Sequence, residues 1–496
     1  MRAEVAVSFA ALALFAVAVH APGARSDFSY DDLNFVLTNT AIRNPASALA
    51  SFAQPFPPHL PNRGIYRPVT NLSYALDYQI GELEPRGYHW TNVALYVLVV
   101  WLVFALARFH DPDRRFAFAV AAVFAVHPVH CEAVDSVTGR SELLAAVFAI
   151  ASILAFAGAA RRQSAAGSTG RSGILVLVSA AAYAASAFSK EVGVFVPAVL
   201  AVYFLCHGRR PGESFASWGR RGGWLLAPFA GVALGYVAAR WNALGWLSPE
   251  HSMLEARSAA FRLHTIGMSW LQYMRQLVAP ATLHVDYYWD QFFLSPRDTL
   301  SWAIAGLSLL GATLAVFAAA IVRELRTARA SGRTSILLCG LSFVLVFLFP
   351  VMHVLPTLGW MAERYLFLPS IGLCLLVGLG LREALRAISS PRMRRIAWGV
   401  LLAMAVAAGG VRSRQRALEW RDEVRLWQVE DAARPNDARI LTNLSFAYAK
   451  RAQDLEAWDA LRRARVAQPR IAALDDILDS IERRLRVHER LKSGVD

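Results

Sequence analysis

Two adjacent carboxylates, Asp31 and Asp32, lie in the segment SDFSYDD (26–32), shortly after the first apolar block of the chain. A carboxylate beside a membrane-embedded cavity can act as a general base or bind a cation. An aspartate that precedes a helix can instead accept hydrogen bonds from unpaired backbone amides. The pair is therefore a candidate catalytic site, with a helix cap as the alternative.

A second polar segment, HPVHCEAVDSVTGRSELL, occupies residues 127–144. His127, His130 and Glu132 are residue types that bind metal ions, and together they form a candidate site for a divalent cation. Pro128 separates the two histidines, however, and their spacing matches no strong zinc pattern. Histidines at the membrane interface are the alternative, and the sequence leaves both interpretations open.

The same segment carries further charged residues, Glu132, Asp135 and Arg140. Glu132 and Asp135 are three residues apart, so we expect them to share one face of a helix. Arg140 follows one to two turns later, where it is a candidate contact for an anion. The segment thus contributes acidic and basic candidates for substrate binding.

Charged residues also interrupt apolar sequence in SKEVGVFVP (189–197) and AERYLFLPS (362–370). Ionisable side chains at membrane depth are costly unless they are paired or functional. Lys190 and Glu191 are neighbours that point in different directions, so we expect them to face different partners. Arg364 is a natural ligand for phosphate, because arginine contacts phosphate oxygens in a bidentate manner. An anchor in the belt of aromatic residues at the membrane surface is the alternative.

The elements that carry these residues are predicted to be membrane helices. The chain has 496 residues, of which 56% are hydrophobic and only 18% charged, whereas soluble proteins carry about 25% charged residues. The apolar residues form blocks of about 17–22, the length that spans a bilayer as a helix. We therefore expect an all-α polytopic membrane bundle and exclude a water-soluble enzyme. The net charge of +14 comes from short clusters between apolar blocks, which argues against binding of nucleic acid.

The basic clusters also predict the topology. The five clusters are 108–115, 161–171, 207–221, 323–333 and 382–395. If all of them face the cytoplasm, about eleven helices cross the membrane, with the N-terminus inside and the C-terminus outside. The candidate site residues then share one external face, together with the long first loop, 21–88. We expect 261–283 to be interfacial or re-entrant rather than a span. Residues 1–24 form the first span or a cleaved signal peptide.

The C-terminal part has an ordinary soluble composition and a repeat. Pro435 and Pro469 are 34 residues apart, which is the tetratricopeptide period. The large, aromatic and small positions of that repeat are occupied by Leu441, Leu444, Tyr448, Ala457, Leu461 and Ala464. We predict a membrane domain over 1–411 and a short tetratricopeptide-like domain over 412–496, with a capping helix over 470–490. One and a half repeats are too few to form an independent array, so the tail should pack on the membrane domain or on a partner.

The order YDD, YRP, HPVHCEAVDSVTGRSELL, SKE and AERYLFLPS, followed by the repeat, resembles the transmembrane and tetratricopeptide repeat-containing O-mannosyltransferase family. The resemblance implies a GT-C helical bundle, a polyprenyl-phosphate sugar as donor and inverting transfer on the external face. It also implies that Asp31 is the catalytic base and places Arg67 in the YRP element. Two features depart from the family: Cys131 stands where threonine is usual, and the repeat tail is short.

The sequence therefore predicts a membrane glycosyltransferase that moves a sugar, mannose by the resemblance, to an acceptor hydroxyl of protein Ser or Thr. Asp31 would accept the proton, and Arg364 with Lys190 would hold the phosphate. Asp32, Glu132 and Asp135 would position the acceptor or a divalent ion, and Arg67, Arg140 and Glu191 are further binding candidates. A lipid or glycan acceptor is the first alternative, and a transporter or scaffold for polyprenyl-linked glycans is the second. A bacterial inner membrane is the expected location.

Overall fold

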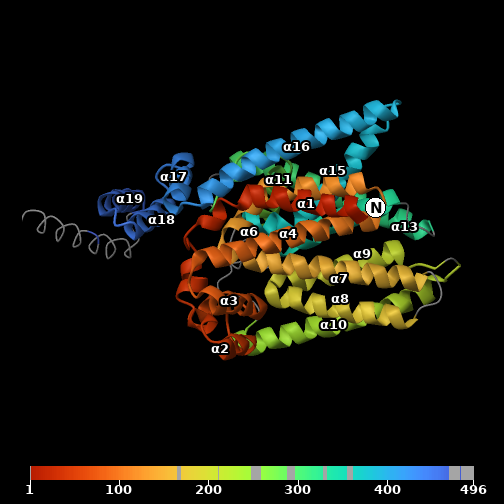
Figure 1. Cartoon of the computed structure of the whole chain (residues 1–496), viewed down its shortest axis with the longest axis horizontal. Helices are drawn as coiled ribbons and strands as arrows, with labels where there is room; N and C mark the ends of the chain where they lie inside the picture. Colours follow the sequence, from red (N-terminus) through yellow and green to blue (C-terminus); the bar gives the residue numbers. More distant parts are fainter. Residues whose placement is uncertain are drawn as a thin grey trace, which may run out of the picture.

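The computed structural model of the chain describes residues 2–164, 169–210, 212–246, 258–287, 296–327, 332–354, 361–468 and residue 481. These residues are mostly helical (Figure 1). No strand occurs within the described ranges, where the pairing of Tyr287 with Met361 is an isolated β-bridge. The predicted all-α fold is confirmed.

Eight helices in the described ranges are long and apolar enough to cross a membrane: Pro85–His110, Val137–Ser164, Ser172–Ser189, Phe215–Leu244, Thr299–Arg326, Gly332–Val351, Glu363–Leu385 and Pro391–Trp420. A further candidate is the pair Arg114–Ala125 and Pro128–Asp135, which is bent by 54° at its break. Two shorter apolar helices, Glu4–His20 and Glu191–His207, accompany them. The multi-pass membrane character is confirmed. The predicted count of about eleven is reached only if the bent pair and both shorter helices also cross.

The basic clusters between these helices gather at one end of the bundle. Direct contacts connect each cluster to the next. Arg382 pairs with Asp111, and Arg333 lies 3.5 Å from Glu383. Three arginines donate to backbone carbonyls of other clusters: Arg161 to Phe109 at 2.6 Å, Arg210 to Gln163 at 2.8 Å and Arg209 to Leu325 at 3.0 Å. All five predicted clusters take part in these contacts. They therefore share one face, as predicted, and the opposite end carries the candidate site.

Small residues allow the membrane helices to approach closely. Between α7 (Arg140–Ser164) and α8 (Thr169–Ser189), the Ser152 hydroxyl donates to the Ser179 carbonyl at 2.8 Å. Between α14 (Gly332–Leu348) and α15 (Phe367–Leu385), a Cβ atom on Gly372 would collide with the Gly340 carbonyl. Interfaces of this kind are typical of membrane helices, where packing rather than the hydrophobic effect drives association.

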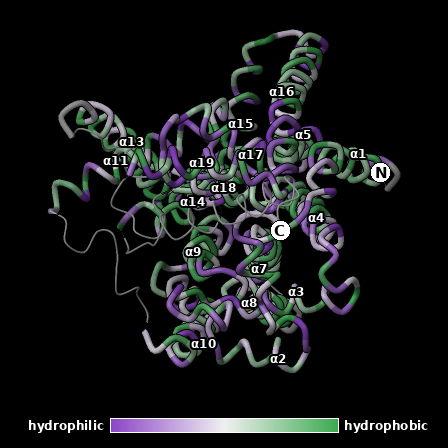
Figure 2. Tube along the Cα trace, turned by 90° about the vertical axis from the view of Figure 1, so that its left-hand side faces the viewer, coloured by the Kyte–Doolittle hydropathy of each residue, from purple (hydrophilic) through white to green (hydrophobic). Residues whose placement is uncertain are grey.

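The outer helices of the bundle expose apolar side chains, as expected for contact with lipid. Figures 1 and 2 show α16 (Pro391–Trp420) and α10 (Phe215–Leu244) at opposite edges of the bundle. Exposed residues on these two helices include Val400, Met404, Leu234 and Trp241.

The first loop is a folded layer at the candidate-site end. It contains α2 (Pro45–Ala50) and α3 (Pro68–Gly81), and Figure 1 shows both at the end of the bundle that also carries the C-terminal helices. The side-chain amide of Asn39 donates to the Asn71 side chain at 2.8 Å and so attaches the first part of the loop to α3. Its own small core contains Phe35, Val36, Ile42, Ala48, Phe56 and Tyr74.

The segment predicted to be interfacial or re-entrant forms α11 (Ala259–Val278), which is not one of the eight described helices that are long and apolar enough to cross a membrane. It packs on α13 (Pro296–Arg326), where Gly267 and Gly306 let the two backbones touch. How α11 sits relative to the membrane stays a prediction.

The C-terminal tail continues directly from the last membrane helix. α16 runs through residue 411 without a break, so the boundary predicted there lies within a helix. α17 (Glu423–Ala433), α18 (Ala438–Lys450) and α19 (Asp454–Ala467) follow. Leu441, Ala457, Leu461 and Ala464 are buried between α18 and α19. The assignment as a tetratricopeptide repeat stays a prediction, because Pro469 and nearly all of 470–490 lie outside the described residues.

Candidate functional site

The polar loops predicted to share one face are in direct contact with one another. The backbone N–H of Thr138 donates to Asp32 at 3.0 Å, which joins the first two loops. Lys190 of the third loop pairs with Glu142, and Arg364 of the last loop pairs with Glu132. The structure therefore brings the four polar loops together at one end of the bundle.

Asp31 and Asp32 have different environments. Asp32 is fully buried, and its carboxylate accepts hydrogen bonds from the backbone amides of Ser29 and Thr138, both at 3.0 Å. The Asp31 side chain is 28% exposed and lies 3.7 Å from Arg63. Asp32 thus holds the loop in place, whereas Asp31 is the member of the pair that a substrate can reach.

Burial raises the pKa of Asp32 to about 7, and the nearby charge of Asp31 contributes to the rise. The hydrogen bonds from Ser29 and Thr138 act in the opposite direction, because they favour the charged form. Burial has the larger effect. Asp32 therefore releases its proton near neutral pH.

Arg67, at the start of α3, is tied to the third loop. Its Nε and Nη2 atoms donate to Glu191 Oε2 at 3.0 and 2.9 Å. Arg240 of α10 lies 3.7 Å from the other carboxylate oxygen. Glu191 is thus clamped between two arginines. Lys190 points instead to Glu142, so the predicted divergence of Lys190 and Glu191 is confirmed.

Lys190 and Arg364 face the same aromatic ring. The Lys190 Nζ atom lies 5.2 Å and the Arg364 guanidinium 5.4 Å from the centre of the Tyr365 ring. The Arg364 backbone N–H also donates to Glu132 Oε2 at 2.8 Å. The Arg364 side chain remains 33% exposed, whereas that of Lys190 is buried. Arg364 is therefore the cation of this pair that an incoming anion can approach.

The charged side chains of the site affect one another's charge. Burial lowers the pKa of Lys190, as do the positive charges of Arg67 and Arg364, whereas the carboxylates Glu191 and Glu132 act in the opposite direction. The charge that acts most strongly on Arg364 is that of Glu132, and Asp31 adds a smaller effect. The partly exposed Asp31 carboxylate and the partly exposed Arg364 guanidinium thus lie within reach of each other's charge. This arrangement can accept a proton from a hydroxyl and hold a departing phosphate at neighbouring positions.

Arg140 does not belong to this site. Its guanidinium is fully buried: Nε donates to Asn92 at 2.7 Å, Nη1 to Asp77 at 2.5 Å and Nη2 to the Tyr88 carbonyl at 2.7 Å. The prediction that Arg140 contacts a substrate anion is wrong, because each of the three guanidinium nitrogens donates to an acceptor within the protein. Arg140 instead connects α7 to α3 and α4 (Pro85–His110).

The predicted metal ligands are each held by other partners, although the centres of the His127 and His130 rings lie 5.4 Å apart. His127 Nε2 lies 2.9 Å from the Leu277 carbonyl, and His130 contacts Tyr96 and Ser370, each at 2.8 Å. Glu132 is occupied by Arg364. Among the described residues, these three side chains are not a group whose ligand atoms lie within 4.8 Å of one another. Glu132 and Asp135 both lie on the short helix α6 (Cys131–Asp135) but have different partners, because Asp135 contacts His20 at 3.0 Å.

Several residues of the site were not predicted. Glu142 and Arg240 lie within apolar helices, and an ionisable residue at such a position is itself a signal of function or pairing. Arg63 and Tyr365 gave no signal, because their roles arise from contacts that only the fold creates.

Fold and site together define an all-helical, multi-pass membrane protein with a charged site at one end. The chain is 26% identical over 437 residues to protein O-mannosyl-transferase F38B6.6 of Caenorhabditis elegans, covering 84% of this chain and 56% of that protein. It is 27% identical to Tmtc1 of Drosophila melanogaster, covering 90% of this chain and 60% of the relative, and 25% identical to human TMTC2, covering 94% and 62%. The predicted resemblance to the transmembrane and tetratricopeptide repeat-containing O-mannosyltransferases is confirmed.

The chain spans between half and two thirds of the length of these relatives. No family model matches it. Among solved structures, the apo oligosaccharyltransferase of Archaeoglobus fulgidus has a TM-score of 0.43 at 12% identity, covering 83% of this chain and 55% of that one. The same archaeal enzyme in complex with an inhibitory peptide and a dolichol-phosphate has a TM-score of 0.42.

Proposed function

We propose that the chain is a membrane glycosyltransferase of the GT-C type that moves mannose from a polyprenyl-phosphate donor to a hydroxyl group of a protein Ser or Thr. The observation that carries the proposal is that a partly exposed carboxylate, Asp31, and a partly exposed guanidinium, Arg364, lie close enough for their charges to interact. The names of the relatives, which are protein O-mannosyl-transferases, support the same chemistry.

In the proposed reaction, the acceptor oxygen forms a bond to the anomeric carbon while the bond from that carbon to the phosphate oxygen breaks. Asp31 takes the proton of the acceptor hydroxyl, and the polyprenyl phosphate leaves with the bonding electron pair. Arg364, with Lys190 beside it, stabilises the negative charge on the leaving phosphate. Attack opposite the leaving group inverts the configuration at the anomeric carbon.

An apolar groove supports a lipid-linked donor. A cavity of about 530 Å³ lies between α5 (Arg114–Ala125), α11, α15 and α16, with lining that includes Leu277, Leu373, Val377 and Ala405. Leu373 lies within three turns of Arg364 along the same element, and Arg412 adds a cation to the lining. An apolar groove with a cation in its lining suits an amphiphile with an anionic head.

The proposed orientation in the membrane rests on the different charges of the two ends of the bundle. The end with the basic clusters is assigned to the cytoplasm by the positive-inside rule, which places the site and the C-terminal tail outside. The tail is then available to a protein acceptor or partner. A bacterial inner membrane remains our proposed location.

The test is transfer from labelled polyprenyl-phosphate mannose to a mixture of Ser- and Thr-containing peptides by the purified protein in detergent. Label on peptide supports the proposal. Label on a lipid or glycan supports the alternative acceptor, whereas donor binding without transfer to any acceptor would favour a transporter or scaffold.

A further inference from the structure

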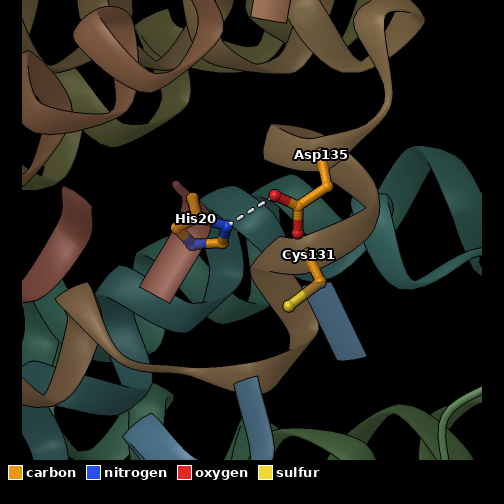
Figure 3. Close-up of side chains that lie close together, drawn as sticks. All are labelled: His20, Cys131 and Asp135. Carbon is orange, nitrogen blue, oxygen red and sulfur yellow. Dashed lines mark hydrogen bonds and ion pairs between the residues drawn. The ribbon is translucent and has the colours of Figure 1, made fainter. Parts of the chain in front are cut away.

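Three buried side chains that are distant in the sequence meet beside the second loop. His20 comes from the end of α1 (Arg2–His20), and Cys131 and Asp135 come from α6. The His20 Nδ1 atom lies 3.0 Å from Asp135 Oδ1, and one potential ligand atom from each residue lies within 4.8 Å of the others. Figure 3 shows the three side chains side by side, with His20 in contact with Asp135 and Cys131 next to both.

The local structure places them there. Cys131 and Asp135 are four residues apart on one helical turn and therefore lie on the same face of α6. The chain that leaves α1 passes so close that a Cβ atom on Gly23 would collide with the Asp135 carboxylate. This close approach brings His20 against α6.

One polar atom of the cluster has no partner. Asp135 Oδ2 is buried and makes no hydrogen bond to any described residue, although Asp135 is only 3% exposed. Figure 3 shows this second carboxylate oxygen directed toward Cys131. A buried carboxylate oxygen without a partner is costly, and a bound cation would supply the missing interaction.

The donor set suits a particular kind of ion. Imidazole nitrogen, thiolate sulfur and carboxylate oxygen are the ligands that Zn²⁺ takes in proteins. A thiolate and a carboxylate together would also balance the two positive charges. Arg416 acts electrostatically on Cys131 and Asp135, but it is paired with Glu419 at 2.6 Å and lies 3.8 Å from both Glu363 and Glu430. Its charge is thus compensated by these carboxylates.

We propose that His20, Cys131 and Asp135 form a structural zinc site. Zinc would replace the proton of the Cys131 thiol, which in the metal-free arrangement is donated to the Ser413 carbonyl at 3.3 Å. That carbonyl oxygen or a water molecule would complete the four-coordinate shell. The site would fasten α1 and α6 to α16. It is distinct from the His127, His130 and Glu132 group and does not depend on the proposed transfer reaction.

The test is the zinc content of tag-free protein, purified in detergent, loaded with zinc and dialysed against metal-free buffer. We expect about one zinc per chain by mass spectrometry of the metal. Loss of a ligand should weaken binding by at least the ~10–100-fold typical of second-shell changes, so Cys131→Ser and Asp135→Asn should lose the metal. Cys339→Ser, which changes a buried cysteine of α14, is the matched control and should retain it.

Cobalt loading gives a second readout that does not involve activity. The wild-type protein and Cys339→Ser should show a thiolate-to-cobalt charge-transfer band, and Cys131→Ser should not. Folded wild-type protein without zinc after loading, or folded Cys131→Ser with the wild-type zinc content, would overturn the proposal. The three side chains would then be a hydrogen-bonded polar cluster only.

Discussion

The backbone N–H of Tyr30 donates a hydrogen bond to Glu423 Oε1 at 3.0 Å and so joins the residue before the acidic pair to the first helix of the C-terminal tail. Tyr30 has a φ of 49°, a left-handed conformation that is unfavourable for a residue with a side chain. Its ring packs edge-to-face on Trp427 with 5.3 Å between centroids. The tail thus holds the acidic loop in its conformation.

Removing the acceptor should therefore loosen the acidic loop. Glu423→Ala leaves the Tyr30 N–H unsatisfied and also breaks the contact of Glu423 with Lys450 at 2.6 Å. A lost hydrogen bond of this kind costs about 1–3 kcal/mol, and we expect the transfer rate to fall about tenfold with donor affinity unchanged. Rates and donor binding measured beside Asp459→Asn, an exposed change on α19, test this. A wild-type rate for Glu423→Ala would show that the tail does not position the loop.

The buried Asp32 should make stability depend on pH. The pKa of Asp32 is raised to about 7, so between about pH 4 and pH 7 the folded protein holds a proton that the unfolded chain has released. The unfolding temperature should therefore fall as the pH rises from about 4 to 7, and it should level off above pH 7. Asp32→Asn should be less stable overall, because its amide nitrogen cannot accept a backbone N–H, and should lose this pH dependence. The measurement is the unfolding temperature of both proteins, by calorimetry in detergent from pH 5 to 8. The same pH dependence in Asp32→Asn as in the wild-type protein would contradict the raised pKa of Asp32.

Arg364→Lys should weaken donor binding while the fold persists. Lysine keeps the charge but lacks the planar pair of donors that matches phosphate oxygens. We expect roughly tenfold weaker binding of a polyprenyl phosphate, which corresponds to about 1.4 kcal/mol. Arg86→Lys, an exposed change at the start of α4, serves as control. Equal affinity in the two variants would leave Arg364 as an interfacial anchor.

Arg140→Lys should act on stability rather than on donor binding. Lysine cannot reach Asn92, Asp77 and the Tyr88 carbonyl together, so buried acceptors lose their donors. We expect a loss of about 1–3 kcal/mol in the free energy of unfolding, seen as a lower unfolding temperature. Weaker donor binding by the folded variant, at unchanged stability, would restore Arg140 as an anion contact.

The sequence was sufficient to predict the class of fold and the meeting of the polar loops. Apolar block length predicted membrane helices, and the distribution of basic residues predicted that Asp31, Glu132, Lys190 and Arg364 lie at one end. Neighbouring residues point apart, so the different surroundings of Lys190 and Glu191 could also be predicted.

The roles that sequence reasoning missed depend on how helices stack. Arg140 is structural because α3 and α4 present Asp77 and Asn92 to it, and neither is within 45 residues of Arg140 in the chain. The contact of His20 with Asp135 joins residues 115 positions apart. Spacing within a motif carries no information about such partners, so no sequence pattern gave a reason to consider His20 together with Asp135.

The most direct test of the central claim is the transfer rate of Asp31→Asn with labelled donor and peptide acceptor. Asparagine keeps the size and the hydrogen bonding of Asp31 but cannot accept the proton of the hydroxyl. Loss of a general base costs about 10²–10⁴-fold, so the rate should fall by that amount while donor binding stays near the wild-type value. A full transfer rate for Asp31→Asn would contradict the account.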